Sequence, residues 1–203
     1  MSMSNLWGRF LKNRLGPNKN QQTAEKKIRK RLFFALCPEE STRQELAAVQ
    51  ELFPRQLSDN WIRPANLHIG LVFSGGVEAK WLDDLIEVAE AVQSAEFELS
   101  LDRITYWPHK RILCLTPSIV PKELKQLVTD LVKNLEGVGF EMEKRTYRTY
   151  LSLAREASYP PLDIQLEQPI VWKARSFALV ESRRDGLGVA HSLVQAWALS
   201  RPD

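Results

Sequence analysis

The sequence contains two short stretches of one pattern: residues 67–71 read Leu-His-Ile-Gly-Leu, and residues 149–153 read Thr-Tyr-Leu-Ser-Leu. Alternate side chains of a β-strand point to opposite faces, so the leucines and the isoleucine share one face in each stretch. The other face carries one ring and one small residue, about 7 Å apart. The pattern therefore predicts two similar strands that bury one face and present polar side chains on the other.

The rest of the chain predicts strands and helices in alternation. Apolar runs and alternating patterns predict strands, and apolar residues three and four positions apart predict helices. Glycine and proline pairs predict the turns, among them Gly75-Gly76 and Pro108-His109. The expected strands are 32–37, 66–74, 97–102, 111–115, 149–155, 174–182 and 189–198, the expected helices are 46–53, 81–92 and 124–135, and 159–169 is expected to be a connector. This order predicts an α+β fold: two similar lobes of mainly antiparallel sheet, helices on the outer faces, and an active cleft between the lobes.

The composition is that of a folded domain. The 203 residues are 44% hydrophobic and 26% charged, close to the globular average. Cys37 and Cys114 form no Cys-x-x-Cys pair, and no secretory segment or long apolar run accompanies them, so we expect a cytoplasmic protein without a transmembrane segment. The histidines, cysteines and carboxylates show no metal-ligand spacing, and we expect no required metal or cofactor.

Positive charge gathers at the start of the chain. Residues 1–31 hold nine Lys and Arg against the single acid Glu25, whereas the remaining residues have a net charge of −5. Residues 1–30 are therefore predicted to be a basic, flexible extension that can contact nucleic acid or an anionic surface, ahead of a bilobal domain at 31–203. Within the extension, residues 5–15 fit a short amphipathic helix, although a disordered segment is the simpler expectation. A monomer is the default expectation.

Five segments, in order, carry a resemblance to a known family. They are Arg31-Leu-Phe-Phe-Ala-Leu36, Arg63-Pro-Ala-Asn-Leu-His-Ile-Gly-Leu71, residues 139–155 and Leu179-Val-Glu-Ser-Arg-Arg183 with Trp197-Ala-Leu199. Together they resemble the RNA 2′,3′-cyclic phosphodiesterases, also called 2′-5′ RNA ligases, of the two-histidine phosphoesterase superfamily, over residues 31 to about 199. The resemblance implies hydrolysis of 2′,3′-cyclic phosphate ends of RNA or nucleotides to 2′-phosphomonoesters, with 2′-5′ joining as a side activity.

Two positions depart from the pattern of that family, which is His-x-Thr/Ser in each motif. His68 matches the first histidine, but Gly70 replaces the hydroxyl residue after it. Ser152 supplies the second hydroxyl, whereas Tyr150 occupies the place of the second histidine. Arg155 matches the arginine that commonly closes the second motif.

The resemblance and the chemistry together assign roles. Opening a cyclic phosphate needs a base for water, an acid for the departing sugar oxygen, and donors for the phosphoryl oxygens. Phenols ordinarily ionise near pH 10, so a phenol donates a proton at pH 7 but is a poor base. We therefore expect His68 as base, Tyr150 as acid or phosphate donor, and Ser152 and Arg155 as phosphate contacts, with reduced activity because both motifs are degenerate.

Other interpretations of these residues remain open. In one alternative, Tyr150 has no chemical role and its ring only fills the space left by Gly70 across the cleft. His109 or His191 would replace the missing imidazole if either reached the cleft, although surface or packing roles are expected for both. Arg148 and Arg175 are expected at the solvated surface. Tryptophans 61, 107, 172 and 197 are expected mostly in the core, with base stacking as the alternative.

Two other functions fit the same sequence. The first is a non-catalytic protein that binds RNA ends or a nucleotide phosphate in the same cleft, which Gly70 and Tyr150 favour. The second is an adaptor in which the basic extension binds and the lobed body serves as scaffold.

Overall fold

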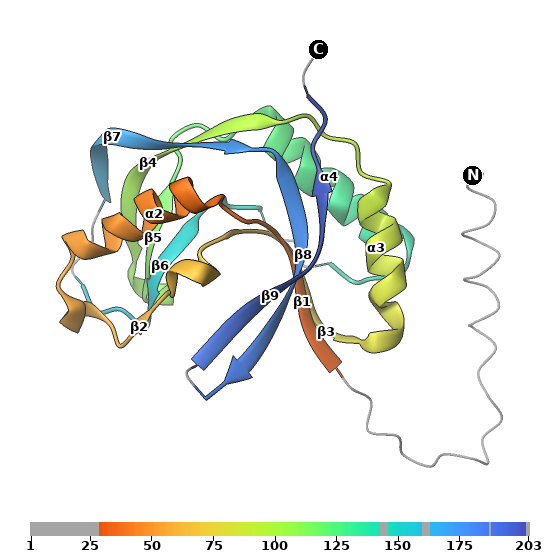
Figure 1. Ribbon diagram of the computed structural model, residues 1–203, viewed down its shortest axis with the longest axis horizontal. Helices are drawn as coiled ribbons and strands as arrows, with labels where there is room; N and C mark the ends of the chain where they lie inside the picture. The colour runs from red at the N-terminus through yellow and green to blue at the C-terminus, as the bar shows by residue number, and fades with distance from the viewer. Residues whose placement is uncertain (1–28, 143–145, 160–162, 187, 202–203) are drawn as a thin grey trace.

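The computed structural model describes residues 29–142, 146–159, 163–186 and 188–201 (Figure 1). Residues 5–15, which fit either a short helix or a disordered segment, and nearly all of the basic extension lie outside the described residues. The first described strand begins at Arg29, two residues before the predicted start of the domain. No helix in the described ranges is long and apolar enough to cross a membrane.

The strands of the described chain form one antiparallel sheet of nine strands. The strand order is β7-β4-β5-β6-β3-β1-β8-β9, and the short β2 pairs with β6. The bounds are β1 Arg29–Leu36, β2 Asn60–Trp61, β3 Ile69–Glu78, β4 Phe97–Trp107, β5 Ile112–Thr116, β6 Leu151–Arg155, β7 Asp163–Ala174, β8 Ser176–Asp185 and β9 Gly188–Ala198. The predicted α+β class with mainly antiparallel pairing is confirmed.

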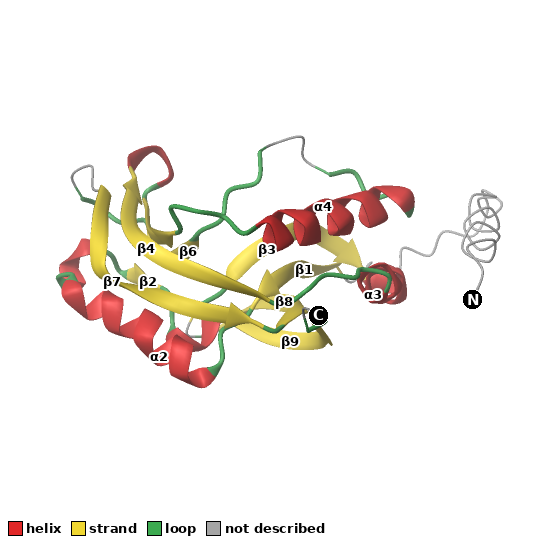
Figure 2. Ribbon diagram, turned by 90° about the horizontal axis from the view of Figure 1, so that it is seen from above, coloured by secondary structure: helices red, strands yellow, loops and turns green. Residues whose placement is uncertain are grey.

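The sheet divides into two lobes where β3 meets β6. These strands share only the bridge between Ile69 and Leu151, so β7-β4-β5-β6 and β3-β1-β8-β9 form two four-stranded halves. The α-helices are α2 Glu40–Ala48, α3 Leu82–Glu90 and α4 Lys122–Gly137. Figures 1 and 2 show α2 beside the first half and α3 and α4 beside the second, with α2 and α4 on opposite sides of the sheet. Short 3₁₀ helices are η1 Val49–Leu52, η2 Arg55–Leu57, η3 Pro64–Asn66, η4 Ala79–Trp81 and η5 Pro108–Lys110.

Helix α4 forms where the apolar spacing predicts it. Its buried residues are Leu124, Leu127, Val128, Leu131 and Leu135, which recur every three or four positions along one face. Pro121 precedes the first turn and has no backbone N–H that would need a partner there. The buried stripe packs this helix against the second half of the sheet, close to β3.

Two of the predicted connections are strands in the structure. The chain passes through Gly75-Gly76 as part of β3, paired with β1, and the positive φ of 70° at Gly75 accompanies a bulge rather than a hairpin turn. The proline-bearing segment 159–169 was predicted to be a connector, but β7 begins at Asp163. Strand β7 lies at the edge of the sheet, where Pro169 removes no necessary ladder donor, and the pairing with β4 is interrupted there.

A second irregularity in β3 decides which side chains face the cleft. The pairing with β1 slips between Phe34 and Ala35, so Val72 opposes Phe34 and Gly70 opposes Ala35. Leu71 and Val72 are consequently both buried in the main core. A bulge reverses the alternation of faces beyond it, and Phe73 therefore lies on the same face as Gly70.

The sheet is apolar on both faces near β1. The main core contains Phe34, Leu36 and Ile69, all fully buried. On the opposite face, a smaller cluster of Phe33, Ala35, Ala178 and Val180 is also buried. Phe33 thus forms an apolar floor beside the polar stretch that begins at His68.

Candidate active site

A cleft of about 640 Å³ lies over the joint between β3 and β6. Its walls come from β3, β6, α4 and the segment that leads into β6. The lining residues are His68, Gly70, Leu71, Val72, Phe73, Gly75, Lys110, Val128, Val132, Glu141, Met142, Thr146, Tyr147, Arg148, Tyr150, Ser152 and Arg155. The structure therefore brings together all four predicted site residues, His68, Tyr150, Ser152 and Arg155.

The imidazole of His68 is held in one tautomer. Its Nδ1 lies 2.7 Å from the backbone carbonyl oxygen of Asn66. Because a carbonyl oxygen only accepts, Nδ1 carries the hydrogen, and Nε2 of the neutral ring is left with a free lone pair. Burial lowers the pKa of His68, the bond to Asn66 opposes this shift, and the positive charge of Arg155 lowers the pKa further. The ring is therefore neutral at pH 7, as a general base must be.

The bridge between β3 and β6 relates the two motifs. Ile69 opposes Leu151, and in the antiparallel register set by this bridge His68 falls opposite Ser152 and Gly70 opposite Tyr150. Ser152 is buried, with 8% of its surface exposed. The remaining imidazole and the remaining hydroxyl of the family pattern thus lie together, and the two departures from the pattern lie together.

Tyr150 stands against an aromatic and a basic neighbour. The rings of Tyr150 and Trp107 meet edge to face with centroids 4.8 Å apart. The ammonium group of Lys110 lies 5.3 Å from the Trp107 ring centroid, within cation–π range. The phenol is therefore supported by residues at the end of the β4–β5 hairpin.

A second phenol lies beside the first motif. The hydroxyl of Tyr147 donates to the backbone oxygen of Gly70 at 3.2 Å. Burial raises the pKa of Tyr147 to about 12, which keeps this phenol protonated. The sequence stretch around Tyr147 gave no signal for this contact, because it joins two segments 77 residues apart.

Phe73 occupies the place where a side chain at position 70 would lie. A Cβ atom at Gly70 would come within 2.7 Å of Cζ of Phe73. The Phe73 ring also stacks on Phe33, with centroids 5.7 Å apart. The alternative interpretation assigned the gap at Gly70 to the bulk of Tyr150, but the structure places the Phe73 ring beside Gly70.

Three cationic side chains line the cleft: Arg155, Lys110 and Arg148. Arg148 was expected at the solvated surface, and it is exposed while also lining the cleft. Arg175 is at the surface as expected, where its guanidinium lies 2.9 Å from the carboxylate of Glu39. The cleft is thus supplied with positive charge at the end of β6 and at the β4–β5 hairpin.

The two remaining histidines differ sharply in position. His109 is exposed in η5. His191, on β9, packs its ring against His68 with centroids 4.9 Å apart and planes at 77°. The packing role expected for His191 is thus found, but its partner is the candidate base itself, which sequence spacing did not indicate.

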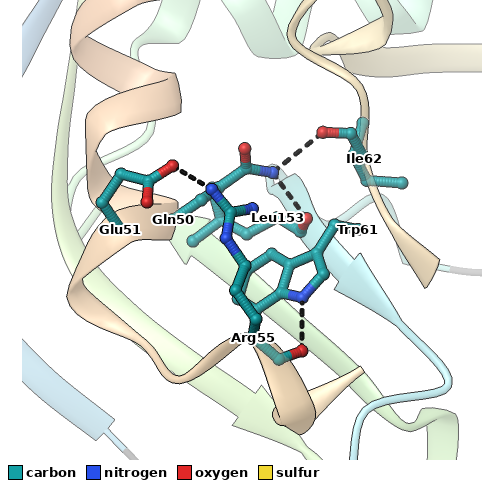
Figure 3. Close-up of polar contacts among 6 residues, drawn as sticks. All are labelled: Gln50, Glu51, Arg55, Trp61, Ile62 and Leu153. Atoms are coloured by element: carbon teal, nitrogen blue, oxygen red, sulfur yellow. Dashed lines mark hydrogen bonds and ion pairs between the residues drawn. The ribbon is translucent and has the colours of Figure 1, made fainter. Parts of the chain in front are cut away.

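A buried amide holds β6 through a backbone carbonyl of that strand. Figure 3 shows the carboxamide nitrogen Nε2 of Gln50 donating to the backbone oxygens of Ile62 and Leu153, at 2.9 and 2.8 Å. The same view shows Trp61 donating from Nε1 to the backbone oxygen of Arg55. This contact network fixes the middle of the strand that carries Ser152 and Arg155.

The tryptophans serve the core more than the cleft. Trp172 is buried, and Trp197 stacks on Phe177 with centroids 5.3 Å apart. Trp61 packs in the network of Figure 3, and Trp107 touches a residue of the cleft, Tyr150. Among the described residues, no group of three His, Cys, Asp or Glu side chains is placed to hold a metal ion.

The fold is that of the two-lobed phosphoesterases. The structure superposes on the apo form of Escherichia coli LigT with a TM-score of 0.79 at 24% identity, covering 86% of this chain and 99% of that one. A protein of Thermus thermophilus superposes with a TM-score of 0.73 at 21% identity, covering 85% of this chain and 100% of that one.

Sequence comparison identifies the family. Residues 36–114 match the model of the LigT like Phosphoesterase family. The chain is also 30% identical, over 129 residues, to a protein of Escherichia coli strain K12 named RNA 2′,3′-cyclic phosphodiesterase, and the match spans 63% of this chain and 73% of that protein. The chain belongs to this family of LigT-like phosphoesterases, as the two motifs around His68 and Tyr150 predicted.

Proposed function

We propose that the protein hydrolyses 2′,3′-cyclic phosphate ends of RNA or nucleotides to 2′-phosphomonoesters. The single observation that carries this proposal is the bond from His68 Nδ1 to the carbonyl of Asn66, which leaves Nε2 as a base in a cleft lined by cations. Two comparisons support the substrate class: the protein that is 30% identical is named RNA 2′,3′-cyclic phosphodiesterase, and Escherichia coli LigT has been solved in complex with 3′-AMP.

The reaction needs a base that takes a proton from the attacking water and an acid that gives a proton to the departing sugar oxygen. Nε2 of His68 removes a proton from water as the water oxygen attacks phosphorus, and the bond from phosphorus to the 3′ oxygen breaks. The phenol of Tyr150 gives its proton to that departing oxygen. After turnover the His68 imidazolium releases its proton to solvent and the Tyr150 phenolate regains one, which restores both groups. A 5′-hydroxyl in the place of water would give the 2′-5′ joining reaction.

The polar and cationic side chains around His68 and Tyr150 bind the phosphate. Arg155, Lys110 and Arg148 line the cleft, and Ser152 lies opposite His68 in the strand register. Charge-assisted hydrogen bonds to phosphoryl oxygens are about twice as strong as neutral ones. We assign Arg155 and Ser152 to the phosphoryl oxygens, because both belong to the strand that faces the base.

The rate is expected to lie below that of a protein with two intact motifs. The acid is a phenol rather than an imidazole, and Gly70 offers no hydroxyl to the phosphate. A missing acid or base function costs on the order of 10²- to 10⁴-fold in rate. The affinity for the substrate phosphate is expected to fall less than the rate, because the cationic side chains of the cleft remain.

A second candidate is a protein that binds RNA ends or a nucleotide phosphate without turning them over. The observation that favours it is Phe73, whose ring takes the space beside Gly70 where the family places a hydroxyl. In this case Tyr150 contributes bulk and a hydrogen bond, and His68 serves as a hydrogen-bond partner of the phosphate.

We further propose that the protein works as a monomer in the cytoplasm, with the basic residues before position 31 adding electrostatic attraction to RNA. The described cysteines, Cys37 and Cys114, are both free, which suits a reducing compartment.

The test is hydrolysis of a nucleoside 2′,3′-cyclic monophosphate and of a short RNA with a cyclic phosphate end, between about pH 5 and pH 10. The wild type is compared with His68→Ala, Tyr150→Phe and Tyr150→His, and the exposed His109→Ala is the control. Catalysis as proposed gives activity that is lost in His68→Ala, falls by about 10²- to 10⁴-fold in Tyr150→Phe, and is unchanged in the control.

The other outcomes separate the two candidates. Turnover that survives Tyr150→Phe intact would show that the phenol supplies only bulk. A wild type that binds a 2′-phosphorylated nucleotide without turnover, together with a gain of activity in Tyr150→His, would identify the protein as a binder with an intact cleft.

A further inference from the structure

Two histidine rings touch although they come from opposite ends of the domain. The ring of His191, on the last strand, meets the ring of His68 edge to face with centroids 4.9 Å apart. Phe33 contacts both rings, with centroid distances of 4.9 Å to His68 and 5.1 Å to His191. The candidate base is therefore enclosed by two rings on the face of the sheet that carries the cleft.

A single asparagine ties the two histidines together. The backbone oxygen of Asn66 accepts from Nδ1 of His68, and its side-chain oxygen accepts from the backbone N–H of His191 at 3.1 Å. Its amide nitrogen donates to the backbone oxygen of Val189 at 2.7 Å, and Arg63 also donates to that oxygen. The start of β9 is thus fastened to the residue that sets the tautomer of His68.

His191 does not stand where the second histidine of the family pattern would stand. Aromatic rings with centroids 4.9 Å apart are in van der Waals contact, so a phosphate group cannot lie between these two imidazoles. His191 is also not among the residues that line the cleft. Any effect of His191 on the reaction must therefore pass through His68.

We propose, on the basis of the function proposed above, that His191 is a positioning residue that fixes the orientation of the His68 ring and excludes water from its rear face. The contacts of the His68 ring are the His191 ring, the Phe33 ring and, at Nδ1, the Asn66 carbonyl, and His68 lines the cleft. A base held within a narrow range of orientations reacts faster, and a misplacement of about 1 Å costs on the order of 10²-fold in rate.

The charges around the pair favour the neutral rings. Arg155 from β6 acts on both histidines, and Arg63, from the segment before η3, acts on His191. Burial first, and then the charges of His68, Arg155 and Arg63, lower the pKa of His191 to about 4. His191 is consequently uncharged at pH 7, and it acts on His68 by contact and desolvation.

The experiment compares His191→Ala, which removes the ring, with His191→Phe, which keeps a ring of similar shape, and uses the exposed His109→Ala as the matched control. Nitrogen NMR of the imidazole of His68 reports its tautomer and titration midpoint in each protein, whether or not the protein turns over substrate. The kcat for a nucleoside 2′,3′-cyclic monophosphate is measured at a pH where His68 is fully deprotonated.

The proposal predicts that His191→Ala loses on the order of 10²-fold in kcat and that its His68 midpoint moves up toward the ordinary value of about 6.5. His191→Phe is expected to restore both quantities, and the control to leave both unchanged. Wild-type kcat and midpoint in His191→Ala would overturn the proposal, and so would a His191→Phe protein as impaired as His191→Ala, because the imidazole itself would then be needed. An inactive wild type would refute the cyclic phosphodiesterase function alone, since the NMR comparison still decides whether His191 positions His68.

Discussion

Restoring a hydroxyl at position 70 is expected to fail unless Phe73 is also changed. A Cβ atom at Gly70 would lie 2.7 Å from Cζ and 3.0 Å from Cε2 of Phe73. Carbon atoms in contact are ordinarily about 3.5 to 4.0 Å apart, so the ring would have to retreat by about 1 Å. The backbone is no obstacle, since Gly70 is not among the described glycines with a positive φ.

The cost follows from what the Phe73 ring would lose. The ring is 49% exposed, so it is free to swing outward, but doing so gives up its stacking on Phe33. Aromatic pairs of this kind contribute about 0.5 to 1.5 kcal/mol, and the added atoms introduce some of the strain of about 1 to 3 kcal/mol seen in overpacked sites. We therefore expect Gly70→Ser to lower the free energy of unfolding by about 1 to 2 kcal/mol.

A double-mutant cycle isolates this clash. Unfolding by denaturant is measured for the wild type, Gly70→Ser, Phe73→Ala and the double variant, together with the affinity of each for a 2′-phosphorylated nucleotide. The double variant should be more stable than the sum of the single effects by about 1 kcal/mol, and it should bind the phosphate more tightly than Phe73→Ala does. Single effects that add to within about 0.5 kcal/mol would refute the steric argument.

Three further predictions concern the cleft and its support. Arg155→Ala should raise KM by about 10- to 100-fold, because a charge-assisted hydrogen bond to the phosphate is lost. The positive charge of Arg155 lowers the pKa of His68, so its removal should move the acid limb of the kcat/KM profile to higher pH. His191 has a lowered pKa of about 4, so its contribution to stability is complete above pH 6.5 and is lost as the pH falls toward 4. Solvent screens this partly exposed ring, so urea unfolding should show a loss of about 1 to 2 kcal/mol over this range that is absent in His191→Phe. Gln50→Ala should destabilise the fold by about 1 to 3 kcal/mol in the same assay, because the carbonyl of Ile62 loses its buried donor.

Matched surface variants control for these changes. Arg175→Ala removes an arginine whose partner is Glu39 at the surface, and it should leave KM and the acid limb as they are. Gln56→Ala removes an exposed glutamine from η2 near Gln50, and it should leave the unfolding free energy within about 0.5 kcal/mol of the wild type. Equal effects in the control and test variants would contradict the assigned contacts.

The sequence predicted most of the strands and helices, although not β7, and the face on which the candidate site lies. The alternation in 67–71 and 149–153 correctly separates the buried leucines from His68 and Tyr150, because a side-chain period of two is a local property of a strand. Helix α4 was likewise predicted from the spacing of its apolar residues. Strand alternation and helix spacing depend on residues a few positions apart, so the sequence pattern alone predicts them.

The parts that the sequence did not predict depend on contacts between distant segments. By simple alternation Phe73 would join Leu71 in the core, but the bulge at Leu71 and Val72 turns it toward Gly70. The contact of His191 with His68 depends on the position of β9 beside η3, which no spacing of residues encodes. The sequence shows that Gly70 replaces the hydroxyl residue of the family pattern. It does not show that the Phe73 ring occupies the space that the hydroxyl side chain would take.

The fastening of Asn66 to His191 and Val189 also bears on when the site becomes complete during synthesis. The bond from the backbone of His191 to Asn66 spans 125 residues, and it closes with the last strand of the sheet. A nascent chain lacking β9 would already contain every residue that lines the cleft, yet its base would lack the partner ring and the anchor on Asn66. The motif around His68 is therefore synthesised early, but its contacts form only when β9 is added. A shortened chain that ends before β9 would have a cleft whose base, His68, is not held in place.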